Sequence, residues 1–374
     1  MSFLDKLLEG VEVEYKTLGE ITNVLRGKRL TRELLSTKNI YPVFHGGLDP
    51  LGYYCDFNRL ADTVMIINVG ASAGTVGYSS VDFWSSDGTY CIDHTEILNN
   101  KFLYYFLTGE QYFLKSKVRV AGIPTLDAFI VEKIQVPVPP LEIQREIVRI
   151  LDTFTELTTE LTTELTTELT ARKKQYNYYR DQLLSFEEGD VEWKELGDTV
   201  RTIVAPTKLK KEAYHEYGKI PIIDQGLAFI GGYTDEDLKP LAPGEYVIFG
   251  DHSEHIKYVD FPFIQGADGL KILKPFSNSA KYIYYAFQNF YQKEYTYKRH
   301  WAKASETLIP IPCPSNQKKS LEIQAEIVRI LDTFTELTAE LTAELTAELT
   351  ARKKQYNYYR DLLFNFPKPE KVIS

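Results

Sequence analysis

The chain has 374 residues, of which 44% are hydrophobic, and its net charge is -9 at pH 7. This length and apolar content predict two or three domains with buried cores and exclude a largely disordered protein. The three cysteines, Cys55, Cys91 and Cys313, lie too far apart for a CxxC pair or a zinc knuckle, so we expect a reducing, cytoplasmic environment. No uncharged apolar run is long enough to predict a membrane span, and the acidic start is unlike a signal peptide.

The net negative charge is spread along the chain. Residues 1–140 carry 13 Lys+Arg against 16 Asp+Glu, and residues 187–320 carry 17 against 19. Phosphate neutralisation supplies much of the affinity of proteins for nucleic acid. Binding to nucleic acid would therefore need local basic clusters or a basic partner.

Residues 1–140 predict a globular segment of mixed α/β type. Tyr, Phe, Val and Ile alternate with Gly and Pro, and short strands are expected within residues 43–54 and 62–70. The glycine-rich residues 69–77 lack the lysine of a phosphate-binding loop, so they predict a turn between two strands.

Residues 141–186 predict one long helix. Apolar residues recur in steps of three and four, and neither Gly nor Pro interrupts them. Pro139 and Pro140 precede the helix and Gly189 follows it, as expected for helix ends. At 1.5 Å per residue the helix would be roughly 70 Å long. Its TTEL tetrads place leucines in steps of four at 157, 161, 165 and 169, and so continue the apolar stripe.

Residues 187–320 predict a second globular segment of the same class. Short strands are expected within residues 219–226 and 244–251. Three passages echo the first segment: residues 13–20 match 191–198, residues 41–56 match 220–235, and residues 100–107 match 279–287. The two globular segments are therefore predicted to be distant copies of one unit.

Residues 321–366 repeat residues 141–186 with differences at only seven of 46 positions, which are 145, 159, 163, 167, 182, 184 and 185 in the first copy. Ser320 is the predicted N-cap of this second helix, and Pro367 is expected to end it. A long helix with a narrow apolar stripe needs a partner in water, and the other copy offers the nearest matching surface. We therefore expect an intramolecular antiparallel coiled coil.

The predicted fold is α+β, with two mixed α/β domains separated by two long antiparallel coiled-coil helices and a pseudo-two-fold relation from the internal duplication. Residues 6–15 resemble the passage that follows a helix copy, so the start of the chain is expected to pack beside the end of the second helix. The predicted boundaries are 1–140, 141–186, 187–320 and 321–366, followed by a tail at 367–374.

Several features together resemble the specificity subunit of type I restriction-modification systems. They are the order of elements, the helix-entry motif PLEIQREI at 140–147 with its copy SLEIQAEI at 320–327, the TTEL and TAEL tetrads, and residues 248–273. The resemblance covers nearly the whole chain and is to the subgroup with TAEL-type tetrapeptide repeats. It implies a target-recognition domain in each globular segment and a bipartite, asymmetric target in double-stranded DNA.

The resemblance also implies partners. They are two methyltransferase subunits docked on the spacer helices and restriction/translocase subunits that join them. S-adenosylmethionine is expected on the partner methyltransferase and no cofactor on this chain, which is expected to be a non-catalytic subunit.

The tetrads predict how the two halves of the target are spaced. One tetrad more or less would change the helix length by about 6 Å, close to two base-pair rises of roughly 3.4 Å. The alternative is a low-complexity stretch produced by replication slippage.

We find no motif for catalysis in this sequence. The only Pro-Pro pair, at 139–140, lacks the neighbouring residues with which an adenine methyltransferase grips a flipped base. Asp251, His252, Glu254 and His255 are close enough in sequence to suggest a metal site, but no other ligand cluster supports one. Structural hydrogen bonding or DNA contact is the favoured interpretation.

Basic residues cluster beside aromatic residues at matched places in both globular segments. Lys and Arg would neutralise phosphates there, and Arg would read base edges. An ordinary solvated surface is the alternative for any single residue. The candidate DNA-binding residues are Arg26, Lys28, Arg29, Arg32, Lys115, Lys117, Arg119, Lys208, Lys210, Lys211, His252, Lys298, Arg299, His300 and Lys303.

Two further basic runs lie on the predicted helices, at residues 172–174 and 352–354. They fit a solvated helix face, a phosphate contact or a docking site for another subunit. A rival interpretation of the whole chain is a structural coiled-coil linker whose two domains bind proteins. That rival predicts no loss of DNA binding when the basic clusters are neutralised.

Overall fold

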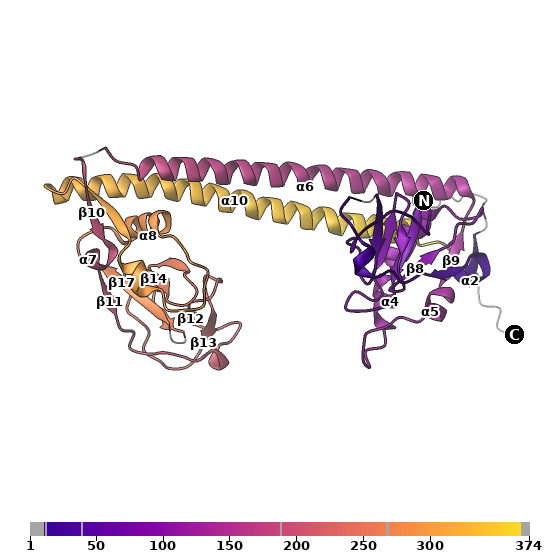
Figure 1. Cartoon of the computed structure of the whole chain (residues 1–374), viewed down its shortest axis with the longest axis horizontal. Helices are drawn as coiled ribbons and strands as arrows, with labels where there is room; N and C mark the ends of the chain where they lie inside the picture. Colours follow the sequence, from indigo (N-terminus) through magenta and orange to yellow (C-terminus); the bar gives the residue numbers. More distant parts are fainter. Residues whose placement is uncertain (1–10, 12, 39, 188, 267–268, 368–374) are drawn as a thin grey trace. The chain divides into compact units, whose positions relative to one another are not determined.

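The computed structural model describes residues 11, 13–38, 40–187, 189–266 and 269–367. The chain divides into two compact units. Unit 1 is Met1–Leu165 with Leu345–Ser374, and unit 2 is Thr166–Glu344. Each unit contains one globular part and a segment of each of two long helices, α6 (Leu141–Leu183) and α10 (Gln317–Leu363) (Figure 1).

The globular part of unit 1 has three sheets. A four-stranded antiparallel sheet has the order β2-β8-β5-β6, and a three-stranded sheet has the order β4-β3-β7, in which β3 pairs antiparallel with β4 and parallel with β7. β1 and β9 form an antiparallel pair. The strands are β1 (Glu14–Thr17), β2 (Val24–Arg26), β3 (Tyr41–Phe44), β4 (Gly52–Tyr54), β5 (Thr63–Ile67), β6 (Val76–Ser79), β7 (Trp84–Ser85), β8 (Thr89–Ile92) and β9 (Gln135–Val138). The helices are α2 (Leu18–Ile21), the 3-10 helix η1 (Arg32–Leu34), α3 (Asn100–Gly109), α4 (Gln111–Ser116) and α5 (Ala128–Glu132).

The core of unit 1 forms where α3 covers the four-stranded sheet. Every residue of β5 is buried, as its continuous run of β-branched and apolar residues predicts. The Asn99 side chain caps α3 by accepting hydrogen bonds from the amides of Lys101 and Phe102. Phe102 is fully buried against the sheet in the same cluster as Ile147 of α6. The sheet, α3 and the long helix therefore share one core.

Unit 2 repeats this topology. Its sheets have the orders β11-β17-β14-β15, β13-β12-β16 and β10-β18, with the same parallel and antiparallel pairings. The strands are β10 (Val191–Glu195), β11 (Val200–Ile203), β12 (Ile220–Ile223), β13 (Gly232–Thr234), β14 (Tyr246–Gly250), β15 (Ile256–Val259), β16 (Ile264–Gln265), β17 (Leu270–Pro275) and β18 (Leu308–Pro312). The helices are α7 (Leu196–Thr199), the 3-10 helix η2 (Lys211–Ala213), α8 (Ala280–Phe290) and α9 (Trp301–Ser305). Within the described residues, α4 has no counterpart in unit 2.

The long helices pair antiparallel within each unit. In unit 1 the Phe154 ring stacks on Tyr359 with centroids 5.2 Å apart, so the first part of α6 meets the last part of α10. In unit 2 the Tyr179 ring stacks on Phe334 at 5.1 Å, so the last part of α6 meets the first part of α10. The predicted α+β fold with two long antiparallel helices is confirmed.

The helix-entry motifs fasten each globular part to its long helix. In unit 1 the Gln144 side chain accepts a hydrogen bond from the Asn99 amide at 2.7 Å, and the Asp152 carboxylate accepts hydrogen bonds from Lys101 and Tyr105. The same bonds recur in unit 2. Gln324 accepts from the Ser279 amide at 2.9 Å, and Asp332 accepts from Tyr285 and pairs with Lys281. The repeated motif therefore encodes the joint between domain and helix.

The structure corrects several details of the helix prediction. Leu157 is 51% exposed, whereas Leu151, six residues earlier and outside the predicted tetrad stripe, is fully buried, because α6 packs against the globular part of unit 1 as well as against α10. Ser320 is not the N-cap of α10. The helix begins at Gln317, the Asn316 side chain accepts from the Lys319 amide, and Ser320 is buried inside the helix. The long helices also end before Gly189 and Pro367, at Leu183 and Leu363.

The predicted closure of the chain start onto the second helix is visible in part. Tyr15 donates a hydrogen bond to the Phe366 carbonyl at 3.2 Å, and Val11 and Val13 pack against the cluster that contains Leu363. Residues 6–10 and 12, which also belong to this prediction, lie outside the described residues.

Candidate DNA interface

The first basic segment of each unit lies along the short strand that pairs parallel with the middle strand of the three-stranded sheet. In unit 1 the Lys28 amide donates to the Ser85 carbonyl of β7 at 2.9 Å. In unit 2 the Leu209 amide donates to the Gln265 carbonyl of β16 at 3.0 Å. These segments then enter η1 and η2. Their cationic residues are exposed, and they are Arg26, Lys28, Arg29 and Arg32 in unit 1 and Lys208, Lys210 and Lys211 in unit 2.

A glycine allows the close approach in unit 1. A Cβ atom at Gly27 would lie 2.1 Å from the Ser86 carbonyl oxygen and 2.4 Å from that of Ser85. Both obstacles are backbone atoms of the β7 strand and its following turn, so they cannot swing away as a side chain can. Only glycine lets this basic segment run so close to the sheet.

The second basic segment of each unit binds the loop that directly follows the central strand. In unit 1 the Leu126 amide donates to the Asn68 carbonyl, just after β5, at 2.9 Å. In unit 2 the His300 amide donates to the Asp251 carbonyl, just after β14, at 2.8 Å. Exposed cations precede these attachment points, and they are Lys115, Lys117 and Arg119 in unit 1 and Lys298 and Arg299 in unit 2.

In each unit the residues after the short parallel strand connect the two basic segments. The Asp87 carbonyl of unit 1 accepts from Arg26 Nε at 3.3 Å and from Asn68 Nδ2 at 3.4 Å. In unit 2 Gln265 binds the first segment, and the Gly269 carbonyl accepts from the Asp251 amide. The fold thus brings together two basic segments that are far apart in the sequence, at the same place in both units.

Several of these cations form ion pairs with carboxylates of the same chain. Arg119 Nη2 lies 2.9 Å from Asp127 Oδ1. In unit 2 the Glu294 carboxylate pairs with Lys298 at 2.8 Å and with Lys303 at 3.1 Å, and these two hydrogen-bonded ammonium groups lower the Glu294 pKa to about 2. Exposed pairs of this kind are weak and screened by salt, so phosphate groups can compete for the same cations.

The two candidate histidines have different positions. The His252 ring is partly exposed and stacks on Tyr297 with centroids 5.4 Å apart, and its Nδ1 is 3.1 Å from the Lys298 carbonyl. The His300 side chain is fully buried, with Nδ1 3.2 Å from Glu294 and Nε2 2.8 Å from the Thr296 carbonyl. His300 therefore shapes the second basic segment from inside, and the prediction that it contacts DNA directly is corrected.

The acidic residues of the 251–255 motif hold this segment in place. Asp251 Oδ1 accepts from the amides of His300 and Trp301, at the start of α9. The Glu254 carboxylate accepts from the Tyr291 hydroxyl at 2.6 Å and from the amides of Glu294 and Tyr295, both at 2.8 Å. Burial opposes the charge of Glu254, but these three donors together keep its pKa below the usual value. The motif is thus a hydrogen-bonding centre, the structural one of the two favoured interpretations.

Exposed apolar residues lie beside the second basic segments, and of these the aromatic Tyr297 was expected from the sequence beside its basic cluster. Val120 is 80% exposed and Ile123 71% in unit 1, whereas Tyr295 is 88% exposed and Tyr297 92% in unit 2. Apolar side chains beside cations can stack on or wedge between bases. The only signal of Val120 and Ile123 in the sequence is an apolar residue inside a charged loop, which is weak evidence because single exposed apolar residues are common.

The basic runs on the long helices are exposed and partly paired. Arg172 Nε lies 2.8 Å from Glu168, and Arg352 Nε lies 2.8 Å from Glu348, one helical turn earlier in each case. The neighbouring lysines at 173, 174, 353 and 354 are exposed as well. Both runs therefore present cations to solvent on the long helices.

The described part of the chain lacks two further features. None of its helices is both long and apolar enough to cross a membrane. Nor does any group of three or more His, Cys, Asp and Glu residues, within those same ranges, have a geometry that could hold a metal ion.

Comparison with known proteins decides the family. The type I restriction modification DNA specificity domain matches the chain twice, over residues 10–171 and 188–351. The chain belongs to the type I restriction-modification DNA specificity family. Each match covers one globular part and most of the helix that follows it, so the duplication inferred from the sequence is a duplication of the family's domain.

Relatives cover the whole length of this specificity subunit. It is similar to the EcoR124I/EcoR124II type I restriction enzyme specificity subunit of Escherichia coli, with 34% identity over 100% of this chain and 99% of that protein. Two solved structures share its fold. A chain from a type I restriction-modification system aligns over 97% of its own length and 94% of this chain, with 17% identity and a TM-score of 0.65. The S subunit from M. genitalium aligns over 100% of its own length and 99% of this chain, with 20% identity and a TM-score of 0.53.

Family membership assigns the role of the whole chain. Specificity subunits are the non-catalytic, DNA-recognising component of restriction-modification complexes.

Proposed function

We propose that this subunit reads a bipartite, asymmetric target in double-stranded DNA, one half with each globular part. The observation that carries the proposal is the pair of basic segments that both units hold at the same place on the same topology. The shared topology favours one mode of docking for both units. The two halves of the target would differ because the side chains at these places differ.

The proposed partners follow from the role. Two methyltransferase subunits would dock on the long helices and carry S-adenosylmethionine, and restriction/translocase subunits would join them in the cytoplasm. Because the chain has a net charge of -9, its own phosphate contacts are offset by acidic surface. We therefore expect weak DNA binding by the isolated subunit and strong binding by the assembled complex.

The TTEL and TAEL tetrads would set the spacing between the two half-sites, as in the subgroup with TAEL-type repeats. The tetrads lie in two uninterrupted helices, α6 and α10, and neither has a proline or glycine that would bend it. Both copies have the same number of tetrads. Equal lengths keep the antiparallel partners in register.

Footprinting of the assembled complex on DNA tests the proposal. The expected result is two short protected segments of unlike sequence, separated by a stretch whose sequence does not matter. Protection of one continuous short site, or protection without sequence preference, would overturn it. A complex assembled without this subunit is the control and should protect neither segment.

A further inference from the structure

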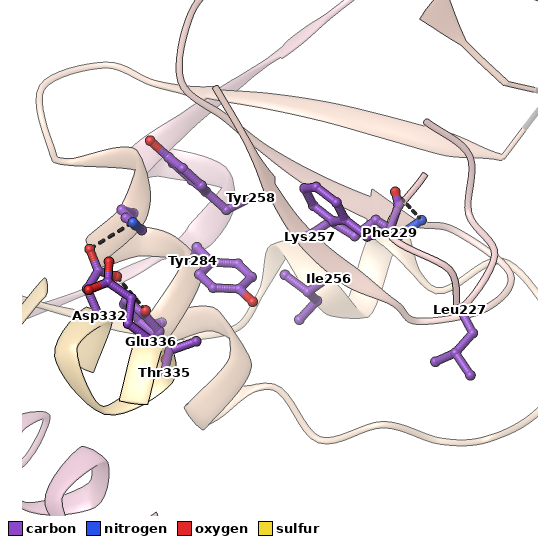
Figure 2. Close-up of a pocket in the computed structure, with 11 residues that line it drawn as sticks. Leu227, Phe229, Ile256, Lys257, Tyr258, Tyr284, Asp332, Thr335 and Glu336 are labelled. Carbon is purple, nitrogen blue, oxygen red and sulfur yellow. Dashed lines mark hydrogen bonds and ion pairs between the residues drawn. The ribbon is translucent and has the colours of Figure 1, made fainter. Parts of the chain in front are cut away.

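Unit 2 contains a buried lysine that the role described so far does not use. Lys257 lies on β15 and is only 6% exposed. An ammonium group is seldom buried unless its three donors are satisfied. Figure 2 shows Lys257 beside Phe229, on the loop that joins β12 to β13.

Lys257 binds the backbone of this loop. Its Nζ donates to the carbonyls of Asp224 at 2.8 Å, Ala228 at 2.6 Å and Phe229 at 3.5 Å. The Asp224 carboxylate, 3.9 Å away, supplies the nearest negative charge. One side chain therefore joins the beginning and the end of the loop and fixes its conformation.

Packing against the long helix does not hold the loop. A cavity of about 360 Å³ separates Leu227 and Phe229 from Tyr284 of α8 and Asp332 of α10 (Figure 2). Leu227 is 83% exposed and Phe229 is 49% exposed. The bonds from Lys257 are thus one restraint on an apolar loop that projects from the sheet. Further restraints are the hydrogen bond from Ser253 Oγ to the Gln225 carbonyl at 2.5 Å and the contact of the Phe229 ring with Phe261.

The loop emerges between the two basic segments of unit 2. It begins directly after Ile223, which pairs with Gln265, the residue whose carbonyl binds the first basic segment. The Gln225 side chain accepts from the His252 amide at 3.2 Å, and the His252 ring binds the Lys298 carbonyl of the second basic segment. A duplex that contacts both basic segments would therefore meet this loop.

Unit 1 is built differently at this position. Gly77 occupies the place of Lys257, as the matching registers of β5 with β6 and β14 with β15 show. A Cβ atom at Gly77 would lie 2.3 Å from Leu48 Cδ2, so the loop side chain of unit 1 folds down onto the glycine. Leu48 is accordingly 41% exposed, half the exposure of Leu227.

We propose that Lys257 is a specificity-determining positioning residue, which holds the 224–229 loop so that its exposed side chains, Leu227 above all, contact the half-site read by unit 2. The Gly77 arrangement keeps the matching loop of unit 1 low, and this contributes to the difference between the two half-sites. The inference rests on the proposed function and adds to it the element that distinguishes one half-site from the other.

The test uses the assembled complex and a pool of DNA with both half-sites randomised, from which bound molecules are selected and sequenced. Lys257→Met keeps the length of the side chain but removes the hydrogen bonds to the loop. We expect a loss of discrimination of roughly tenfold at one or more positions of one half-site and no change in the other, since a single mismatch costs about 1–3 kcal/mol. Leu227→Ala, at an exposed position that does not threaten folding, should relax the same half-site.

Lys219→Met is the matched control, because Lys219 is exposed at the opposite end of the β12–β13 hairpin. It should leave both half-sites unchanged. The inference is overturned if Lys257→Met releases the loop in hydrogen exchange but leaves the base preference intact, or if both half-sites change equally. If the unaltered complex selects no bipartite sequence at all, the proposed function itself fails, and that outcome is recognised before any variant is compared.

Discussion

At the scale of single residues, buried carboxylates maintain the shape of the second basic segment in unit 2. Glu254 has a left-handed backbone, with φ of 56°, and its carboxylate receives three hydrogen bonds. An L-residue rarely adopts this conformation without such support. The fold therefore tolerates local strain in order to place one acceptor among three donors.

Glu254→Gln tests this arrangement, because an amide nitrogen would face hydrogen-bond donors. We expect a loss of about 1–3 kcal/mol in the free energy of unfolding at pH 7. The folded pKa of Glu254 lies below its usual value of 4.5, so the carboxylate stabilises the native state above about pH 4.5 and this contribution is lost as pH falls further. The difference between wild type and variant should therefore shrink in acid.

Urea denaturation between pH 3.5 and 7 measures that difference. Glu216→Gln, at an exposed position of the same unit, should show no loss at any pH. A difference for Glu254→Gln that stays constant across this range would contradict the role of the charge.

At the scale of elements, the joint between α3 and α6 rests on Asp152. Its carboxylate accepts a hydrogen bond from Tyr105 at 2.5 Å and pairs with Lys101 at 2.7 Å. Burial and then this carboxylate raise the pKa of Tyr105, so the hydroxyl remains a donor. Asp332 makes the same joint in unit 2 with Tyr285 and Lys281.

Asp152→Ala should loosen this joint in unit 1 and leave unit 2 intact. The bond from the buried hydroxyl predicts a loss of about 1–3 kcal/mol, because the ion pair with the partly exposed lysine adds little. Hydrogen exchange should show faster exchange in α3 than in α8. Glu156→Ala, one turn further along α6 and exposed, is the control, and equal protection of α3 and α8 in Asp152→Ala would refute the joint.

A second prediction for the elements concerns DNA binding by the basic segments. Lys115→Gln with Lys117→Gln, or Lys298→Gln with Arg299→Gln, should weaken DNA binding by the complex. Each lost phosphate contact should reduce the slope of log affinity against log salt by about one unit. Lys318→Gln with Lys319→Gln, exposed on the first turns of α10, should leave the slope unchanged. An unchanged slope in both test variants would favour the rival structural linker.

The sequence predicted the elements well where local patterns decide them. The helices α6 and α10 follow from periodicity without Gly or Pro, and the matched passages of the two units became matched strands and helices. Contacts between distant residues were not predictable. The burial of His300 depends on Asp251 and Glu254, which lie more than forty residues earlier in the chain, and the exposure of Leu157 depends on where the globular part of unit 1 ends against α6.

The same limit applies to the site. The matched basic clusters were visible in the sequence, and the fold joins them through β7 and β16 in a way that no local pattern indicates. Lys257 was overlooked because a lone lysine in a strand resembles any solvated residue. Its importance follows only from its three carbonyl partners, which lie about thirty residues earlier in the chain.

At the scale of the whole molecule, we propose that the tetrads of the two long helices set the spacing between the half-sites. Deletion of residues 160–163 together with 340–343 removes one tetrad from each long helix and keeps the two lengths equal. The helices would shorten by about 6 Å, so the gap between half-sites should shrink by about two base pairs while each half-site keeps its sequence. Footprinting of the variant complex measures the gap. An altered base preference within a half-site, or an unaltered gap, would contradict the role of the tetrads.

One chain with two related but unlike globular parts should specify one target with two unlike halves. Methylome sequencing of a host that carries this subunit with its partner genes tests it most directly, because every methylated site reports a complete recognition event. We expect a single methylated motif of two different short sequences, separated by a gap of constant length whose own sequence does not matter. A palindromic motif, an uninterrupted motif or methylation that disregards sequence would contradict it.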